Sequence, residues 1–476
     1  MRSATCWPLL SLLAFLSVVL GVLRAMPWSD ADAAAASLRR YAVRAALDFQ
    51  AMSTLMPEAS AHPPPPLPLL PPLLPPPPPP PSVPSSSPPP SSSLSLSAPA
   101  VGPPRSTPDA RGECCIEVDG DRACVRAGMR LAFRDNALCE RGTTVAVRDY
   151  ADAWERLLCG VAYISSQDSD TVCPANNMVS TAAAFRARFG EERVLVTDRF
   201  WSTVDADLER LGISTLYQLM AGDVASTGTL PRCARNVVHA VFDAKTPHGD
   251  AYASISPEVP AAPGVNVVLH ITRPLPALPP GAAAAARRDR GIGEGDTVLC
   301  RHGGFTTFDI DWARDALCRL LAERAAAPDR PWLLLLNTAP LACAGAAEAY
   351  GRLVYLPAMS DDGAKARFLA TCDACLHARS SGESFGLAVA ECAMAGLPVI
   401  THGGRGQDGD YHLRVLGRHA LVYFDAESLR ARIDAFDPAE HRPRADVYRA
   451  LYDASSERRV MLDFLRAFRP ELPAKC

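Results

Sequence analysis

The segment Arg379–Thr401 reads RSSGESFGLAVAECAMAGLPVIT, and it decides the fold. The apolar run ACLHAR, which ends at the first residue of this segment, predicts a buried strand. A Ser- and Gly-rich loop follows, and a helix is expected to open near Ser384 and to end at Gly396 and Pro398. The next apolar run, LPVIT, predicts a second strand. Strand, loop, helix and strand in this order are typical of a parallel α/β unit.

The start of this helix is a candidate anion site. The first backbone N–H groups of a helix have no partner within it, so those of Phe385, Gly386 and Leu387 are expected to point into a cleft next to Ser384. Together with the positive end of the helix dipole they suit a diphosphate.

Two carboxylates flank this anion site. Glu383 stands at the mouth of the helix and Glu391 lies eight residues further on, about two turns along the same face. Carboxylates so placed can accept hydrogen bonds from two separate sets of hydroxyls, such as those of a sugar and a ribose. On spacing alone, the alternative is an amphipathic helix with one capping and one solvated glutamate.

The same alternation of short apolar runs and helical stretches occurs on both sides of the Pro- and Ala-rich passage at 274–290. It predicts an α/β fold of two facing doubly wound, Rossmann-like domains, with parallel sheets covered on both faces and ligands in the cleft between them. The expected strands are 129–133, 160–164, 193–198, 215–220, 236–242 and 265–271, then 297–301, 331–337, 352–357, 374–379, 397–401 and 420–424. The expected helices are 144–158, 203–211, 312–325, 361–370, 385–395 and 427–435.

These patterns divide the chain into four parts: a signal anchor at 1–25, a stem at 26–109, an N-terminal domain at 110–274 and a C-terminal domain at 275–476. Trp7–Leu23 has no charge, and its 17 residues are at the short end of what spans a bilayer. It predicts an uncleaved anchor, with a cleaved signal peptide as the alternative. Half of the 44 prolines lie between Pro63 and Pro108, where the chain is expected to be extended and mostly disordered.

Composition limits the classes of function. A net charge of −4 leaves no basic excess for coating nucleic acid, so no nucleic-acid partner is expected. The 15 cysteines are concentrated between Cys114 and Cys173, and in an oxidising lumen some of them should form disulfides. Cys372 and Cys375 make a lone C-x-x-C, which is typical of ordinary buried cysteines rather than of a zinc site.

The string from Gly382 to Thr401 resembles the Glu-x7-Glu signature of retaining glycosyltransferases with the GT-B fold, of the family 4 type. The resemblance extends over about 128–440 and is stronger in the second half. It implies that Glu391 binds the ribose of a nucleotide-sugar, that Glu383 lies beside the donor sugar, and that the amides of Phe385–Leu387 meet the diphosphate or sugar. Ser384 belongs to the same donor site.

The resemblance also implies further site residues. The family has an arginine after the first strand of its C-terminal domain that binds the diphosphate, and Arg301 in TVLCRHGG occupies that place. The lysine that usually follows is missing from Phe305-Thr306-Thr307. Either Arg379 or Arg405 substitutes for it, or activity is impaired.

In the N-terminal half, ALCERGTTVAVRDYA resembles the Gly-containing loop of the family, so Gly142 and Thr143 are expected on the phosphate side of the cleft. Thr143 could equally be an ordinary helix cap. His239 ends an apolar strand and is a candidate catalytic histidine near the reacting sugar, although a core histidine is equally compatible. His248, in the polar loop that follows, is likewise either a histidine near the reacting sugar or an ordinary turn residue.

Together these features predict a nucleotide-sugar-dependent glycosyltransferase, of the hexosyltransferase type, that retains anomeric configuration. No cofactor and no metal are expected, because helix dipoles and basic side chains do the work of a cation in this fold. The expected partners are a nucleotide-sugar donor, a glycan, lipid or protein acceptor, and a membrane. The expected location is the Golgi or endoplasmic reticulum, as a single-pass type II protein, with secretion as the alternative. A catalytically inactive binder of a glycan or partner and a nucleotide-sugar epimerase are the competing functions.

Overall fold

The computed structural model describes residues 105–168, 173–197, 200–227, 230–232, 234–324, 331–343, 351–404, 406–441 and 445–471. The predicted anchor at 1–25, nearly all of the predicted stem at 26–109, and Arg405 lie outside these ranges. Among the helices within them, none has both the length and the apolar character needed to cross a bilayer.

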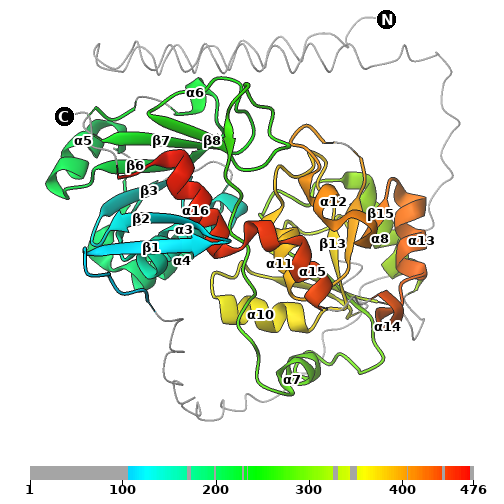
Figure 1. Ribbon diagram of the computed structural model, residues 1–476. Helices are drawn as coiled ribbons and strands as arrows, with labels where there is room; N and C mark the ends of the chain where they lie inside the picture. The colour runs from blue at the N-terminus through cyan, green and yellow to red at the C-terminus, as the bar shows by residue number, and fades with distance from the viewer. Residues whose placement is uncertain are drawn as a thin grey trace, which may run out of the picture. The chain divides into compact units, whose positions relative to one another are not determined.

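Seven parallel strands form the first sheet, in the order β5-β4-β3-β6-β7-β8-β9 (Figure 1). Successive residues of β3 alternate between the two faces, as strand geometry requires: Leu131 and Phe133 join one apolar cluster and Ala132 another. The predicted strand at 265–271 is shortened to β9, and β8 was not predicted. The strands are β3 (Arg130–Ala137), β4 (Val161–Gln167), β5 (Val194–Val196), β6 (Thr215–Met220), β7 (Arg235–Ala240), β8 (Ala251–Ser254) and β9 (Asn266–Val267).

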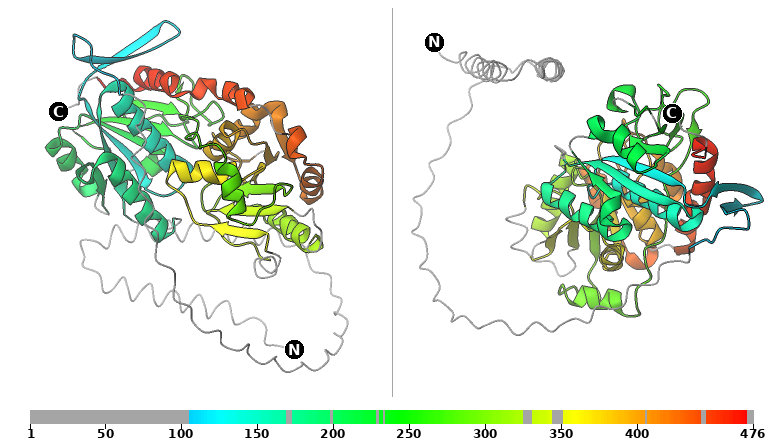
Figure 2. Two further views of the ribbon diagram at one scale, coloured as in Figure 1. Left: turned by 90° about the horizontal axis from the view of Figure 1, so that it is seen from below. Right: turned by 90° about the vertical axis from the view of Figure 1, so that its left-hand side faces the viewer.

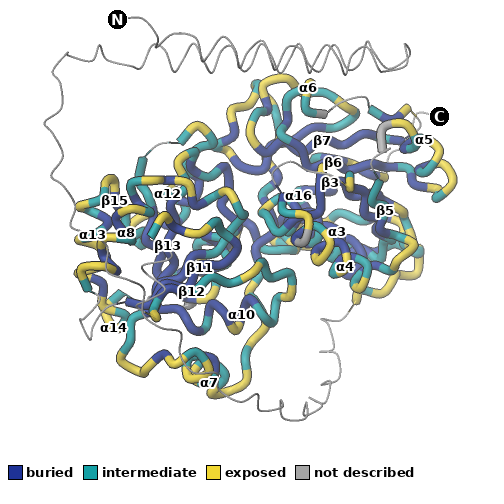
Figure 3. The backbone as a smooth tube through the Cα atoms, turned by 180° about the vertical axis from the view of Figure 1, so that it is seen from behind, coloured by how far each residue is buried: buried dark blue, intermediate teal, exposed yellow. Residues whose placement is uncertain are grey.

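Six parallel strands form the second sheet, in the order β12-β11-β10-β13-β14-β15. Leu334 and Leu336 of β11 belong to the apolar cluster that also contains Leu131 and Phe133 of the first sheet. Leu333 and Leu335, on the other face, belong to a second cluster. Figure 3 shows β11 and β13 of this sheet as buried, whereas the exposed residues lie on the surrounding helices and loops. All six strands were predicted: β10 (Val298–Arg301), β11 (Trp332–Leu336), β12 (Leu353–Leu356), β13 (Ala374–His377), β14 (Val399–His402) and β15 (Ala420–Tyr423).

Both sheets are doubly wound, and in each the strand order reverses beside the first strand: at β3/β6 in the first sheet and at β10/β13 in the second. The loops after those strands diverge to opposite sides and leave room for a ligand at the carboxyl end of the sheet. The prediction of two doubly wound α/β sheets is therefore confirmed.

The helices at the predicted places are α3 (Gly142–Leu158), α5 (Phe200–Arg210), α8 (Asp311–Glu323), α10 (Asp362–Ala370), α11 (Leu387–Met394) and α13 (Ala426–Asp434). The other helices are α4 (Ala175–Phe189), α6 (Val224–Thr227), α7 (Ala282–Arg288), α12 (Tyr411–Leu416), α14 (Pro438–His441), α15 (Ala445–Leu451) and α16 (Glu457–Phe468), with short 3₁₀ turns η1 (Glu191–Arg193), η2 (Gly417–His419) and η3 (Asp453–Ser455).

The C-terminal helix α16 packs on the first half of the chain. It contacts α3, β8 and an antiparallel hairpin formed by β1 (Glu113–Val118) and β2 (Asp121–Arg126), and Figure 2 shows the helix beside the hairpin. Its apolar face buries Val460, Phe464 and Phe468, which pack among the aromatic residues of the first sheet. The residues after about 456 therefore contribute to the core of the first half, although the sequence placed them in the 275–476 domain.

Six disulfides join described cysteines: Cys114–Cys159, Cys115–Cys124, Cys139–Cys173, Cys300–Cys372, Cys318–Cys343 and Cys375–Cys392. Cys372 and Cys375 are buried, as expected, but they are not free thiols: Cys372 is bonded to Cys300 of β10 and Cys375 to Cys392 of α11. Three of the bridges begin next to residues of the candidate site: Cys139 precedes Glu140, Cys300 precedes Arg301, and Cys392 follows Glu391.

Candidate functional site

A cavity of about 270 Å³ lies at the carboxyl ends of both sheets. The first sheet contributes the loop after β3 together with Phe242 and His270, and the second contributes the loops after β10, β11 and β13. The two strand-order reversals thus open into one cavity, as the predicted cleft requires. Of the predicted site residues, these line it: Gly142, Thr143, Arg379, Glu383, Ser384, Phe385, Gly386, Leu387 and Glu391.

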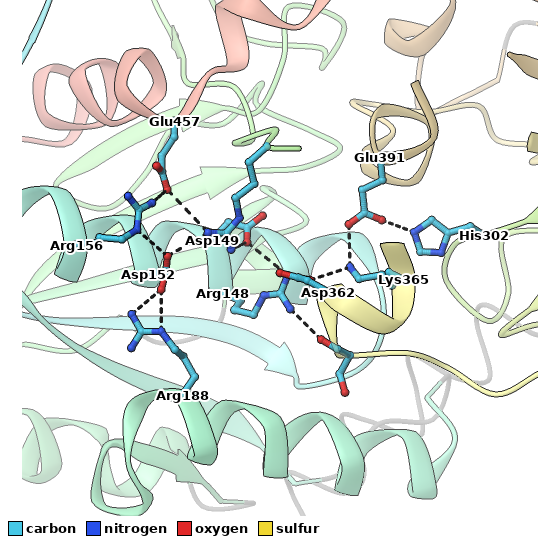
Figure 4. Close-up of polar contacts among 12 residues, drawn as sticks. Arg148, Asp149, Asp152, Arg156, Arg188, His302, Asp362, Lys365, Glu391 and Glu457 are labelled. Atoms are coloured by element: carbon cyan, nitrogen blue, oxygen red, sulfur yellow. Dashed lines mark hydrogen bonds and ion pairs between the residues drawn. The ribbon is translucent and has the colours of Figure 1, made fainter. Parts of the chain in front are cut away.

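Glu391 is the most strongly held acid on the cavity wall (Figure 4). Lys365 of α10 donates to its Oε1 at 2.9 Å, and the Nε2 of His302 is hydrogen-bonded to its Oε2. Burial raises the pKa of Glu391, but the charges of Lys365 and His302 outweigh it and hold that pKa well below the ordinary range. The carboxylate is therefore ionised and fixed in orientation, ready to accept hydrogen bonds from a ligand.

Lys365 is a functional residue that sequence reasoning missed. Its side chain is 1% exposed and lines the cavity. Burial lowers its pKa, yet the neighbouring Glu391 more than compensates, so that the pKa is raised and the ammonium stays charged. The cavity wall thus carries a lysine, but in α10 and not near Phe305. The one sequence signal for Lys365 is its position near the start of the helix that follows β12.

Glu383 lies at the other end of the same wall. The Nε2 of His377 is 3.1 Å from Oε1, and Arg379 donates to Oε2 at 2.9 Å. Burial raises the pKa of Glu383, but the hydrogen bond to His377 and the charge of Arg379 outweigh it and lower the pKa to about 2. Both predicted carboxylates are therefore ionised at neutral pH, and the solvated-glutamate alternative is wrong for both.

Helix α11 begins at Leu387, three residues later than predicted. Gly386 is its N-cap and has φ 87°, a left-handed conformation that favours glycine. An added Cβ there would lie 3.2 Å from His412 and 3.3 Å from Glu383. The unpaired amides of the first turn consequently belong to Leu387, Ala388 and Val389 rather than to 385–387.

Arg301 does not line the cavity, in contrast to the expectation that it grips a diphosphate. It is 1% exposed and donates to the carbonyls of Leu336 and Asn337, both at 2.6 Å, to Thr307 at 2.9 Å and to the carbonyls of Gly303 and Gly304. Burial lowers its pKa to about 9, so it remains charged at neutral pH. Its donors shape the loop 302–307 that lines the cavity.

Arg379 lines the cavity, but its charge is already balanced. It donates to Glu383 and, at 2.7 Å, to Asp408, while its Nε donates to Ser381. It therefore positions Glu383 and closes the loop, and contributes little net positive charge to the cavity.

The loop after β3 faces the start of α11. Gly142 opens α3, and a Cβ added to it would lie 3.9 Å from a methyl carbon of Leu387. Thr143 donates to Asp135 at 3.2 Å, and the neighbouring Thr144 donates to the same carboxylate. Asp135 is fully buried, so the two threonines anchor this loop against the end of β3.

His239 is a core residue, and the expectation that it faces the cleft is wrong. It is 0% exposed, lies 2.7 Å from the hydroxyl of Tyr217 and 2.8 Å from the carbonyl of Val268, and does not line the cavity. Burial lowers its pKa to about 4. His248 is half-buried in a loop, where it packs against Tyr252 and lies 2.8 Å from the carbonyl of Thr246, and it does not line the cavity.

His270 is the histidine that the first half of the chain places on the cavity. It is 3% exposed, packs edge-on against Phe385 at 5.2 Å between ring centroids, and its Nδ1 has no hydrogen-bond partner among the described residues. Burial lowers its pKa well below the ordinary range, so the ring is neutral. A buried, unpartnered imidazole is costly unless a ligand hydroxyl satisfies it.

We expect His270→Phe to weaken the binding of a hydroxyl-bearing ligand in this cavity by about 3- to 10-fold, the value of one neutral hydrogen bond. Because the ring packing is kept and an unsatisfied nitrogen is removed, thermal stability should be unchanged or higher. His239→Phe is the matched control, since it leaves the Tyr217 hydroxyl without its partner and should lower stability instead. A His270→Phe variant with unchanged ligand affinity would show that the imidazole does not contact the ligand.

A chain of ion pairs connects this wall to the first half of the molecule (Figure 4). Arg148 of α3 pairs with Asp362 of α10 at 2.9 Å and donates to the carbonyl of Ser360 at 3.0 Å. Asp362 lies 3.6 Å from the ammonium of Lys365, which holds Glu391. The position of Glu391 is thus coupled to the contact between the two halves.

No described Asp-x-Asp triplet lines the cavity. Asp309 accepts hydrogen bonds from the backbone N–H and hydroxyl of Ser380, and Asp311 opens α8. Among the described residues, the one cluster with metal-ligand geometry is Glu113 with Cys115 and Cys124. These two cysteines are joined in a disulfide, which removes their thiolates.

No protein-family model matches this chain, and no curated protein matches it. Solved structures resemble it at low identity. Sucrose-phosphate synthase from Thermosynechococcus elongatus is 14% identical, with 72% of this chain and 98% of that one covered and a TM-score of 0.49. A glycosyltransferase from Rickettsia africae is 11% identical, with 72% and 98% covered and a TM-score of 0.49. HepE from Anabaena, in complex with UDP and glucose, is 13% identical, with 71% and 98% covered and a TM-score of 0.48.

Proposed function

We propose that this chain is a glycosyltransferase that moves a sugar from a nucleotide-sugar donor to an acceptor hydroxyl. One observation carries the proposal: Glu383 and Glu391, both ionised and both held by basic partners, flank the first turn of α11 on the wall of a single cavity. A helix N-terminus between two oriented carboxylates offers a phosphate site between two hydroxyl-binding sites. A nucleotide-sugar has the same order of groups.

The resemblance to the Glu-x7-Glu signature suggests which carboxylate would bind which end of the nucleotide-sugar. Glu391 would accept from the ribose, and Glu383 would lie beside the transferred sugar together with His270. The amides of Leu387 and Ala388 would meet the diphosphate. The ammonium of Lys365 lines the same cavity and is paired with Glu391 at 2.9 Å, so it would offer an N–H donor next to the phosphate site rather than an unbalanced positive charge.

The transfer itself needs no protein nucleophile. The bond from the anomeric carbon to the phosphate oxygen breaks, and its electron pair stays on the diphosphate. The acceptor oxygen bonds to the same carbon from the same face, and the departing phosphate oxygen takes the acceptor's proton, so the anomeric configuration is retained. The helix dipole and Lys365 stabilise the charge that develops on the leaving group, a contribution that is often the largest in catalysis.

We expect binding and transfer to persist in excess EDTA. The reason is that the described Asp-x-Asp triplets lie off the cavity wall, while Lys365 and the α11 amides occupy the place of a cation. Transfer assays with and without EDTA check this. Activity abolished by EDTA and restored by manganese would contradict it.

The compartment proposed is the lumen of the endomembrane system, with the chain anchored by Trp7–Leu23. The six disulfides between described cysteines support it, because such bonds persist in oxidising compartments. A glycan, lipid or protein acceptor would meet the cavity on that side of the membrane.

Thermal shift of the full chain against a panel of UDP-, GDP- and CMP-sugars tests the proposal, followed by mass spectrometry of the products. Stabilisation by one nucleotide class with release of the nucleoside diphosphate or monophosphate supports transfer. Conversion of the bound sugar into its epimer, still attached to the nucleotide, supports the epimerase alternative. Stabilisation without turnover for any donor and acceptor would indicate a catalytically inactive binder.

A further inference from the structure

Glu140 is an acidic residue of the cavity wall that neither the signature nor the proposed transfer uses. It lies in the loop after β3, next to the disulfide of Cys139 with Cys173. Its backbone is held from two elements: its N–H donates to Asn177 at 2.9 Å, and its carbonyl accepts from Asn337 at 3.1 Å. The backbone of Glu140 is therefore fixed from two sides on the cavity wall.

The carboxyl group of Glu140 has little to stabilise a negative charge. Its one hydrogen bond comes from the hydroxyl of Thr181 on α4 at 3.4 Å, and it forms no ion pair within the described part of the chain. The cations whose charges lower its pKa are Lys365 on α10 and Arg148 on α3, whereas the guanidinium of the adjacent Arg141 donates to Asp135, Asn136 and the carbonyl of Ala137. The contacts of Lys365 and Arg148 are made elsewhere, with Glu391 and Asp362 respectively.

A second carboxylate competes for the same cations. The charge of Glu391 on α11 acts on Glu140, and Glu391 is itself hydrogen-bonded to both Lys365 and His302. When two carboxyl groups share one site, the one with fewer partners keeps its proton. Burial raises the pKa of Glu140 to about 7, with Lys365 and Arg148 partly offsetting it and Glu391 adding to it.

The loop that carries Glu140 also faces the phosphate site. Gly142, two residues further on, packs beside Leu387 at the start of α11. An ionised Glu140 would therefore repel a diphosphate, whereas its neutral form can donate an O–H to a phosphate oxygen.

We propose that Glu140 binds the diphosphate of the donor as a neutral carboxylic acid, so that donor binding takes up a proton. This inference rests on the proposed function. The phosphates of a nucleotide diphosphate-sugar are diesters and keep constant charge near neutrality, so the proton is taken up by the protein. Donor affinity should accordingly fall as the pH rises through the pKa of Glu140, since only the protonated form binds.

The test is donor affinity of the full chain by isothermal titration calorimetry, with the tightest-binding UDP- or GDP-sugar of the panel. For a group with a pKa of about 7, affinity should fall about 30-fold between pH ~6 and pH ~8.5. Titrations at pH ~8 in two buffers of different ionisation enthalpy should show uptake of about one proton per donor bound.

Glu140→Gln is the decisive variant, because its amide donates a hydrogen bond at every pH. It should bind the donor with nearly pH-independent affinity and without proton uptake. Glu192→Gln, at an exposed glutamate far from the cavity wall, is the matched control and should keep the wild-type pH dependence.

Wild-type affinity that is constant over this pH range, or a Glu140→Gln variant with the same pH dependence as wild type, would overturn the inference and leave the proposed function standing. Absence of binding to every nucleotide-sugar at both pH values would overturn both.

Discussion

Glu391→Ala is expected to weaken nucleotide-sugar binding by about 10- to 100-fold, the value of a hydrogen bond to a charged acceptor. It should also destabilise the unliganded protein by about 3–5 kcal/mol, because Lys365 is left charged in a buried position. Asp362, at 3.6 Å, is the remaining partner of that ammonium among the described residues. Calorimetric titration of the donor and thermal unfolding without ligand measure the two effects.

A second variant separates binding from stability. In Glu391→Gln with Lys365→Met both charges of the pair are removed, so much of the lost stability should return while donor binding stays weak. If the double variant recovers donor affinity along with stability, the Glu391–Lys365 pair serves the fold alone and the place of both residues in the donor site is wrong.

The pair of Glu391 and Lys365 also determines how the stability of the folded protein changes with pH. The pKa of Glu391 is depressed in the folded state, so the stability it contributes is complete above the unfolded pKa, near 4.3, and is lost as the pH falls below it. Acid-induced loss of stability should therefore be smaller in the double variant than in the wild type.

Arg301→Ala is expected to lower the rate of transfer by at least ~10²-fold, although the arginine lies behind the cavity wall. Its guanidinium satisfies the carbonyls of Leu336 and Asn337 and shapes the loop that presents His302 to Glu391. Removing it leaves buried carbonyls unsatisfied, which costs about 1–3 kcal/mol each. Misplacement of a site by about 1 Å can cost 10²-fold in rate.

Arg301→Lys distinguishes this role from direct binding of phosphate. A lysine keeps the charge but cannot reproduce the planar set of donors. Stability and turnover should fall nearly as far as in Arg301→Ala. If Arg301→Lys keeps wild-type stability and retains most of the donor affinity, the arginine acts as a charge toward the phosphate and the positioning role is wrong.

Much of the fold followed from the sequence because the chain repeats a local pattern. Apolar runs such as WLLLL at β11 and VLCR at β10 are buried on both faces of a parallel sheet, and their lengths separate them from the amphipathic helices between them. The segment from Gly382 to Thr401 likewise contains its own strand end, loop and helix, so Glu383 and Glu391 could be placed by short-range geometry alone.

The failures share a physical cause, which is that they depend on contacts between distant segments. His239 and His270 both follow apolar runs, and only the sheet order decides that the first is enclosed by Tyr217 and Phe468 while the second reaches the cavity. Lys365 reaches the cavity from α10, which is 60 residues further along the chain than the loop where a lysine was expected. Strand β11 lies beside β10 in the sheet, and Arg301 at the end of β10 donates to the carbonyl of Leu336 at the end of β11. Its side chain therefore points into the protein and away from the cavity.

The most direct measurement of the central claim is turnover of a nucleotide-sugar by the full chain, followed by the anomeric proton signals of donor and product in NMR. The account predicts that one donor class is consumed in the presence of an acceptor and that the product keeps the donor's anomeric configuration. It also predicts that Glu391→Ala lowers the rate of consumption about 5- to 50-fold at donor concentrations near the wild-type KM, as an affinity weaker by about 10- to 100-fold requires. Inverted configuration in the product would contradict the retaining mechanism. No consumption of any donor by a well-folded wild-type protein, across a panel of sugar, lipid and peptide acceptors, would contradict the assignment as a transferase.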